Sequence, residues 1–527
     1  MSRRNFTFFR NSQLLAVILV TSFGLLLQYR SAAAMEPLPS QHAVDEIDRH
    51  LSQLWQDLSI TPAPRCSDEI FIRRVSLDLL GRVPTVAETR DFLQDSHPRK
   101  REQLVDRLLM SPDHDRQLAN FLRTVWLPQT TGPGSAQLAQ HFEAWFVDQL
   151  RQGAGYDTMV YRILTLPANR AIFEDRRSTE EVASTIFEAV SESKPETLAS
   201  NATRAFLGLN LDCAQCHDHP FADWSQQQFW EQAAFFTRPL PVSADQLARL
   251  EIQVVDQSET VVARFLDGEA AVLPEQHDHL TGRRLFADWI AARQNPYLAR
   301  NAVNRMWARF CGAGIIEPLD DISSANPPVA PHLLETLTTA FLQANLDLRE
   351  LERVIVLSAA YQRSSSNGVE RTDELRYFAR HPIRGLQGEQ LYDSLMTTSG
   401  YSTPRLGVDP YGDLQRRYDF AMRFQVERAE QSQRSILQAL TLMNGELVID
   451  ATASSKSPAI RSLSAPFLTN EQRVNQLFLA AFSRYPTPQE RQHLCEWLSD
   501  PEPEEQQRLL SNLFWAMLNS AEFNTNH

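Results

Sequence analysis

The sequence predicts a mainly α-helical, multi-helical protein of two domains, with at most one small β-hairpin between them. Apolar residues recur every three or four positions, as between Val44 and Leu58, which is the spacing of one helix face. The 527 residues exceed the roughly 250–300 at which a single core stops growing. Only the pair Ile252–Val255 and Val261–Phe265 has the β-branched and aromatic content of neighbouring strands.

The first 34 residues have the layout of an export signal. Arg3, Arg4 and Arg10 precede the apolar run Leu14–Leu27, and small residues follow it up to Ala34. The run has 14 residues, fewer than the roughly 20 that span a bilayer. We therefore expect cleavage after Ala34 and a periplasmic or secreted protein without a stable membrane span. A retained signal anchor is the alternative.

The mature chain divides into a helical front domain over residues 35–245, a linker with the hairpin over 246–280, and a helical back domain over 281–527. One segment occurs in similar form in both domains. Arg82-Val83-Pro84-Thr85-Val86-Ala87-Glu88 resembles Arg484-Tyr485-Pro486-Thr487-Pro488-Gln489-Glu490. A threonine followed by a glutamate three residues later forms a capping box. Helices are therefore expected to begin after Thr85 and Thr487, at equivalent positions of two helix–turn–helix units.

Composition and motifs exclude several classes of function. The formal net charge is −14, and a nucleic-acid-binding protein needs a clustered positive face instead. The chain contains no serine nucleophile elbow, P-loop or dinucleotide fingerprint. No hydrolase, kinase or dehydrogenase is predicted.

The chemistry concentrates at Cys213-Ala214-Gln215-Cys216-His217, the attachment pattern of haem c. On a helix, positions three and four residues apart share a face, so both thiols could meet the vinyl groups of one haem while His217 reaches the iron. An exported location suits this attachment. The N-terminal Ser2–Phe6 also resembles a twin-arginine signal, however, and export of an already folded chain would count against haem.

No residue stands out as the second axial ligand of such a haem. Four residues are considered as candidates: Met306, His277, His279 and His141. We expect Met306 in a helical core and His277 and His279 in a solvated loop.

Two other interpretations of the cysteine cluster stay open. Cys213 and Cys216 could form a disulfide, which an oxidising compartment favours. Alternatively, Cys213, Cys216, His217 and His219 could bind a metal such as zinc, with Asp218 or Asp223 completing or orienting the shell.

Several longer stretches resemble known families. Phe71–Thr85 and Cys213–Phe221 resemble the planctomycete cytochrome-c-like domain family of unknown function. The second half resembles its usual partner, the planctomycete-specific C-terminal domain family, also of unknown function. The matching stretches there are Leu285–Trp289, Asn295-Pro296, Asn301–Trp307, Gly314–Asp321, Asn326–Pro328, Ala360–Ser365 and Leu518–Phe523.

The sequence departs from these families at two points. Many relatives place a further Cys-x-x-Cys-His module in front, which this chain does not have. Relatives commonly carry a Cys-x-Cys-x-Arg stretch where this chain has Arg423–Arg428.

The family pattern includes charged residues within apolar helices. These are Arg73 and Asp78, Arg305 beside Asn304, and the acids Glu317, Asp320 and Asp321. Buried charges that pair usually lock helices together. Paired acids could instead act as general acid and base on a sugar polymer. Nothing in their spacing shows that they meet in space.

These inferences predict an exported cell-envelope protein that binds haem c or another redox cofactor and transfers electrons. Its partner would be a redox or envelope protein. The competing prediction is a structural, interaction or metal-binding module without a redox role, which could be associated with polysaccharide degradation.

Overall fold

The structure is a computed structural model that describes residues 40–127, 135–168, 181–220, 222–240, 248–254, 259–365, 372–401, 413–424, 436–499 and 502–527. The predicted signal over residues 1–34 lies outside these ranges. Among the described helices, none is both long and apolar enough to cross a membrane. Helices dominate the described residues, which confirms the predicted fold class.

The front half consists of helices with two short irregular turns. Their bounds are α2 (Ser40–Asp57), α3 (Asp68–Leu80), α4 (Val86–Gln94), α5 (Lys100–Leu109), α6 (Pro112–Trp126), α7 (Ser135–Arg151), α8 (Tyr156–Thr165), α9 (Val182–Val190), α10 (Pro195–Ala202), the π-helical turn η2 (Thr203–Leu207), the 3₁₀ turn η3 (Asp212–Gln215) and α11 (Gln226–Ala234).

The back half is also helical. Its helices are α12 (Thr281–Ala291), α13 (Leu298–Cys311), α14 (Pro331–Gln343), α15 (Leu348–Leu357), α16 (Thr372–Arg376), α17 (Gly388–Ser399), α18 (Asp413–Met422), α19 (Ile436–Asn444), α20 (Glu446–Thr452), α21 (Pro458–Leu463), α22 (Asn470–Phe482), α23 (Pro488–Trp497), α24 (Pro503–Leu518) and α25 (Ala521–Asn524).

In the described part of the chain, two very small antiparallel sheets accompany the helices. The predicted hairpin is present: β1 (Glu251–Gln253) pairs with β2 (Thr260–Val262), with Ile252 opposite Val261. The second sheet joins β3 (Arg384–Gly385) to β4 (Thr525–Asn526). Its strands are far apart in the sequence, so the second sheet brings the C-terminal residues back to the middle of the molecule.

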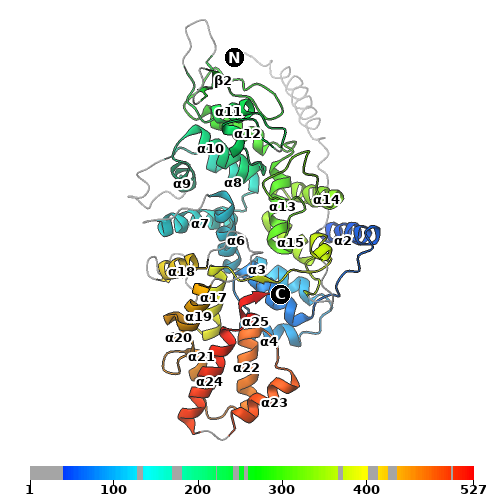
Figure 1. The fold of residues 1–527 in the computed structure, drawn as a ribbon, viewed down its shortest axis with the longest axis vertical. Helices are drawn as coiled ribbons and strands as arrows, with labels where there is room; N and C mark the ends of the chain where they lie inside the picture. Colours follow the sequence, from blue (N-terminus) through cyan, green and yellow to red (C-terminus); the bar gives the residue numbers. More distant parts are fainter. Residues whose placement is uncertain are drawn as a thin grey trace, which may run out of the picture.

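The molecule is elongated, with α8–α12 at one end and α22–α24 at the other (Figure 1). The larger hydrophobic cluster runs from Ala43 to Ala379 and so includes residues on both sides of the predicted linker. The second cluster runs from Leu386 to Phe523 and also takes in Leu77 and Val83. Helix α3 therefore contributes to both cores. The predicted division into residues 35–245 and 281–527 stays a prediction.

The two repeated segments form matching helix–turn–helix units, as predicted. Thr85 accepts a hydrogen bond from the Glu88 amide at 3.2 Å, and Thr487 accepts one from the Glu490 amide at 3.3 Å. In each unit an arginine two residues before the proline clamps this glutamate, Arg82 at 3.0 and 3.1 Å and Arg484 at 2.8 and 3.0 Å. Each arginine also pairs with an acid at the start of a later helix, Asp113 or Glu522.

The match extends to the backbone just before each arginine. Helix α3 ends at Gly81 (φ 72°) and α22 ends at Ser483 (φ 60°), both in the left-handed region. The units also touch, because α22 packs against α4. The repeat is therefore part of the scaffold, in which the same capping box and arginine–glutamate pair occur twice.

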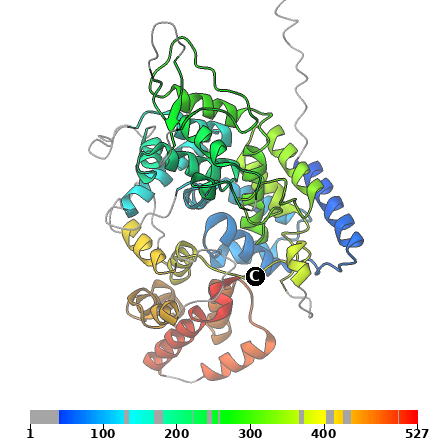
Figure 2. The ribbon, with the colours of Figure 1, turned by 45° about the horizontal axis from the view of Figure 1, so that its top comes forward.

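Arg73 fastens the first unit to the second. This buried side chain on α3 donates to the carbonyl oxygens of Ala481 at 2.8 Å and Phe523 at 2.7 Å. Arg74 donates to the carbonyl oxygen of His527 at 3.3 Å. The C-terminus accordingly lies beside the blue helices of the front half in both views (Figures 1 and 2).

Candidate functional site

The cysteine cluster lies on a short 3₁₀ turn and the residues after it, and not on an α-helix as its spacing suggested. The preceding helical turn stops at Gly208, which has a left-handed φ of 69°. Two side chains of α11, one from its start and one from its middle, then donate hydrogen bonds to backbone carbonyl groups of the loop. Gln226 donates to the carbonyls of Gln215 at 3.1 Å and Cys216 at 3.0 Å, and Trp230 donates to that of Gln215 at 3.2 Å. These hydrogen bonds hold the loop in place without the backbone hydrogen bonds of an α-helix.

Both cysteines of the cluster are exposed free thiols, whereas Cys66 and Cys311 are buried. Ala214, between them, is fully buried and anchors the turn in the core. The thiols are therefore accessible to a reactant from solvent.

The two histidines use their rings in opposite ways. His217 Nδ1 lies 2.7 Å from the carbonyl oxygen of Asp218, so Nδ1 must carry the proton and Nε2 has the free lone pair. His219 Nδ1 accepts the Ala222 amide at 3.0 Å, so in the neutral ring the proton is on Nε2. His217 thus has the ring form of a metal ligand, and His219 does not.

No group of three or more His, Cys, Asp or Glu side chains that could hold a metal ion occurs among the described residues. Met306 is 1% exposed in the core of α13, as expected, and His277 and His279 are exposed in the loop before α12. His141 lies on α7 with Nδ1 2.7 Å from the Gln137 carbonyl.

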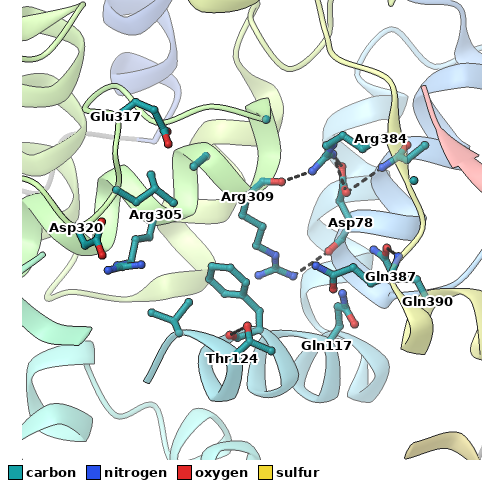
Figure 3. Close-up of a pocket in the computed structure, with 17 residues that line it drawn as sticks. Asp78, Gln117, Thr124, Arg305, Arg309, Glu317, Asp320, Arg384, Gln387 and Gln390 are labelled. Atoms are coloured by element: carbon teal, nitrogen blue, oxygen red, sulfur yellow. Dashed lines mark hydrogen bonds and ion pairs between the residues drawn. The ribbon is translucent and has the colours of Figure 1, made fainter. Parts of the chain in front are cut away.

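A second candidate site is a cavity of about 410 Å³ between the front and back halves. It brings together four of the charged residues singled out from the sequence: Asp78 from α3, Arg305 from α13, and Glu317 and Asp320 from the loop after α13. Asp321 is not among its lining residues. Arg305 and Asp320 lie at one end of the cavity, and Asp78 lies at the other (Figure 3).

The charges at the Asp78 end are already paired. Arg384 Nη2 donates to both Asp78 oxygens, at 3.0 and 3.1 Å. Tyr361 and Asn526 add hydrogen bonds to the same carboxylate at 2.8 and 2.9 Å. Burial, followed by the nearby Asp78 charge, raises the pKa of Tyr361 well above its ordinary value, so its hydroxyl stays a donor. At this end the buried charges are paired between α3 and the two strands β3 and β4, the arrangement expected of charges that hold elements together.

Arg309 belongs to the same network. Its guanidinium pairs with the buried Glu352 at 2.8 Å and donates to the Asp78 carbonyl at 2.9 Å. Glu352 in turn forms a short contact with the buried His114. Burial lowers the pKa of His114, but the Glu352 charge and hydrogen bonds outweigh it, so the pKa is raised.

The charges at the other end have no ion-pair partner. Arg305 donates to the Asn301 side chain and to the Arg204 carbonyl, both at 2.9 Å, and none of the ion pairs among the described residues includes it. Among the described residues, the Glu317 carboxylate accepts a hydrogen bond only from the Gly314 amide, at 3.0 Å. Burial lowers the pKa of Arg305, while the Asp320 and Glu317 charges oppose the shift.

Residues 46–239 match the PSCyt2 family, a protein of unknown function (DUF1549), and residues 282–416 and 410–498 match the PSD1 family, a protein of unknown function (DUF1553). The chain pairs these two domains. This confirms the predicted pairing of the planctomycete cytochrome-like and C-terminal domains. No curated protein and no solved structure matches the chain significantly.

The two candidate sites relate differently to this pairing. The cysteine loop lies wholly within the PSCyt2 segment. The cavity requires both segments, since Asp78 and Gln117 come from PSCyt2 and Arg305 and Arg384 come from PSD1. Asn526 lies beyond both matches and closes one side.

Sequence reasoning missed several cavity residues. Arg309 follows Arg305 by four residues on α13, so helical spacing could have placed both on one face. Gln117, Arg384 and Asn526 carry no local signal, because only the packing of distant segments brings them to the cavity.

Proposed function

We propose that the protein is an exported haem c protein of the cell envelope with an electron-transfer role. Cys213 and Cys216 would attach the haem, and His217 would ligate the iron. The observation that carries the proposal is the 2.7 Å hydrogen bond from His217 Nδ1 to the Asp218 carbonyl. Ligating histidines almost always donate their other ring N–H in this way, which fixes the ring and leaves Nε2 for the metal.

The chemistry of the donor set fits haem better than a zinc site. A structural zinc site closes with four ligands, but the hydrogen bond accepted by His219 Nδ1 leaves its Nε2 protonated. Two exposed thiols and one correctly protonated imidazole remain. That is the set that attached haem uses.

Attachment of haem to these residues needs no additional oxidant. Each thiol adds across one vinyl group, its sulfur bonding to one vinyl carbon while its hydrogen goes to the other. A bound haem would supply one-electron chemistry. Within this chain, Cys213 and Cys216 would fix its position, and the Asp218 carbonyl would hold the proton on His217 Nδ1.

The test is the intact mass and absorption spectrum of the full chain expressed with haem-attachment machinery. We expect the mass of one haem on the wild-type chain and none on Cys213→Ala/Cys216→Ala. Cys495→Ala, which removes a thiol outside the loop, is the matched control and should keep the haem. His217→Ala should alter the spectrum, and His219→Ala should leave it nearly unchanged.

Three results would contradict the proposal. A wild-type chain without haem but with one bound metal, lost in the double variant, would indicate a metal site. A mass lower by two hydrogens and no metal would indicate a disulfide, and the protein would then be a structural or interaction module. Equal spectra for wild type and His217→Ala would show that another residue ligates the iron.

Export is part of the same proposal. N-terminal sequencing of the protein isolated from its native compartment should begin near Met35. A product that begins at Met1 and stays with the membrane fraction would instead indicate the signal anchor.

A further inference from the structure

We infer that the cavity between the PSCyt2 and PSD1 segments binds a neutral, hydroxyl-rich molecule of the saccharide class. This inference is independent of the proposed haem. It rests on which polar groups around the cavity already have partners and which do not.

Gln117 is the first such group. It is 4% exposed, lines the cavity from α6, and makes no hydrogen bond with any described residue. The amide faces the cavity with its donor and its acceptor both unused, so this position favours a ligand that supplies both a donor and an acceptor. Its amide group also packs closely on Gly81, where a Cβ atom would lie 2.4 Å from Gln117 Oε1. The missing side chain at Gly81 therefore leaves room for the amide.

Arg305, Glu317 and Asp320 form the second set. They line one end of the same cavity. Arg305 and Glu317 retain unused donors or acceptors, as described above, and none of the ion pairs among the described residues includes Asp320. The groups left for a ligand thus include donors, acceptors and an amide with both.

The charge balance selects a neutral ligand. Three arginines and three acids line the cavity, so the lining residues carry no formal net charge. Glu352, behind the wall, pairs with Arg309 and also contacts His114. An anionic ligand would meet the unpaired Glu317 and Asp320 in a protein whose net charge is −14. A cationic ligand would meet the unpaired Arg305.

Hydroxyl groups satisfy this mixture best. A hydroxyl can donate to a carboxylate and accept from a guanidinium or an amide, and a sugar ring presents several hydroxyls side by side. The cavity lining also includes Phe121, Val125 and Leu319, whose apolar surface can contact the C–H groups of a sugar ring. A volume of about 410 Å³ lies within the roughly 300–1,000 Å³ of small-molecule pockets.

The test is titration calorimetry on the full chain with sugars that share one ring and differ in charge at a single substituent. The probes are glucose, glucuronate and glucosamine, with galactose, mannose, xylose, N-acetylglucosamine, cellobiose and lactose as further neutral sugars and alanine as a zwitterion. We expect at least one neutral sugar to bind about tenfold more tightly than the charged probes, since hydrogen bonds to charged groups contribute about 1.5–3 kcal/mol.

Variants connect the binding to the cavity. Gln117→Leu keeps the volume and Glu317→Gln keeps the shape, and each should weaken binding of that sugar about tenfold. Glu335→Gln, on the exposed face of α14, is the control and should bind as the wild type does. If Gln117→Leu lowers the thermal midpoint of unfolding, its weaker binding could come from partial unfolding. The conclusion then depends on Glu317→Gln and Asp320→Asn alone. Binding of no neutral sugar, tighter binding of a charged probe or alanine, or binding unchanged in the cavity variants would each overturn the inference.

Discussion

Asp78→Asn should destabilise the protein by about 3 kcal/mol, because it removes one partner of a buried ion pair. Asp78 is 4% exposed and receives Arg384 on both oxygens, at 3.0 and 3.1 Å. Breaking such a pair costs about 3–5 kcal/mol, since the remaining charge stays buried. Arg384 borders the cavity and is 10% exposed, so some water would reach it and the loss should fall at the lower end. Urea unfolding followed by circular dichroism measures the difference.

Two comparisons make this prediction decisive. Asp106 also pairs with an arginine, Arg353 at 2.6 Å, but is 51% exposed, so Asp106→Asn should cost about 0–1 kcal/mol. The double variant Asp78→Asn/Arg384→Gln should lose less stability than the sum of its single variants, because neither charge is then left alone. A loss for Asp78→Asn no larger than that for Asp106→Asn would refute the reasoning.

Three further predictions concern the repeated units. Thr487→Ala should lower the free energy of unfolding by about 1 kcal/mol through loss of the cap on the Glu490 amide; no change in urea unfolding would mean that the Arg484 clamp alone holds the turn. Ser483→Gly should raise it by about 0.5–1 kcal/mol, because φ is 60° there and the buried hydroxyl has no partner; a lower thermal midpoint would contradict this. Hydrogen bonds from Arg484 hold the pKa of Glu490 at about 2, below its ordinary 4.5. The ionised carboxylate therefore adds stability above pH 4.5 that is lost as the pH falls toward 2. For this partly exposed group the contribution is about 1 kcal/mol or less. The difference in thermal midpoint between wild type and Glu490→Gln should shrink from pH 7 to pH 3, and a constant difference would show that Glu490 adds no acid-sensitive stability.

The elements that could be predicted are those determined by residues close to one another in the sequence. Thr85 with Glu88 and Thr487 with Glu490 are three residues apart, and the strands around Ile252 and Val261 are joined by one short loop. The sheet between Arg384 and Asn526 has no such local cause. It forms because Arg384 and Asn526 both donate hydrogen bonds to the Asp78 carboxylate.

The candidate sites divide in the same way. The cysteine pattern located the loop but gave the wrong local conformation, because Gln226 and Trp230 take carbonyls that a helix would otherwise use. Buried charges such as Arg305 and Glu317 could be singled out as unusual within an apolar context. That they share one cavity with Asp78 depends on how α13 lies against α3 and α6, where Arg309 donates to the Asp78 carbonyl and lies over the Phe121 ring. No spacing along the chain contains this packing.

The contacts of Arg73 and Arg74 bear on the order in which the protein can be completed during synthesis. The acceptors of these two side chains lie between 287 and 453 residues downstream. A ribosome that has finished α3 still has to make most of the chain before the last of those carbonyls exist. Until then two buried guanidinium groups would lack partners, a state that is costly in an apolar core. The C-terminal residues, which are synthesised last, therefore complete the hydrogen bonds of α3, which is synthesised early.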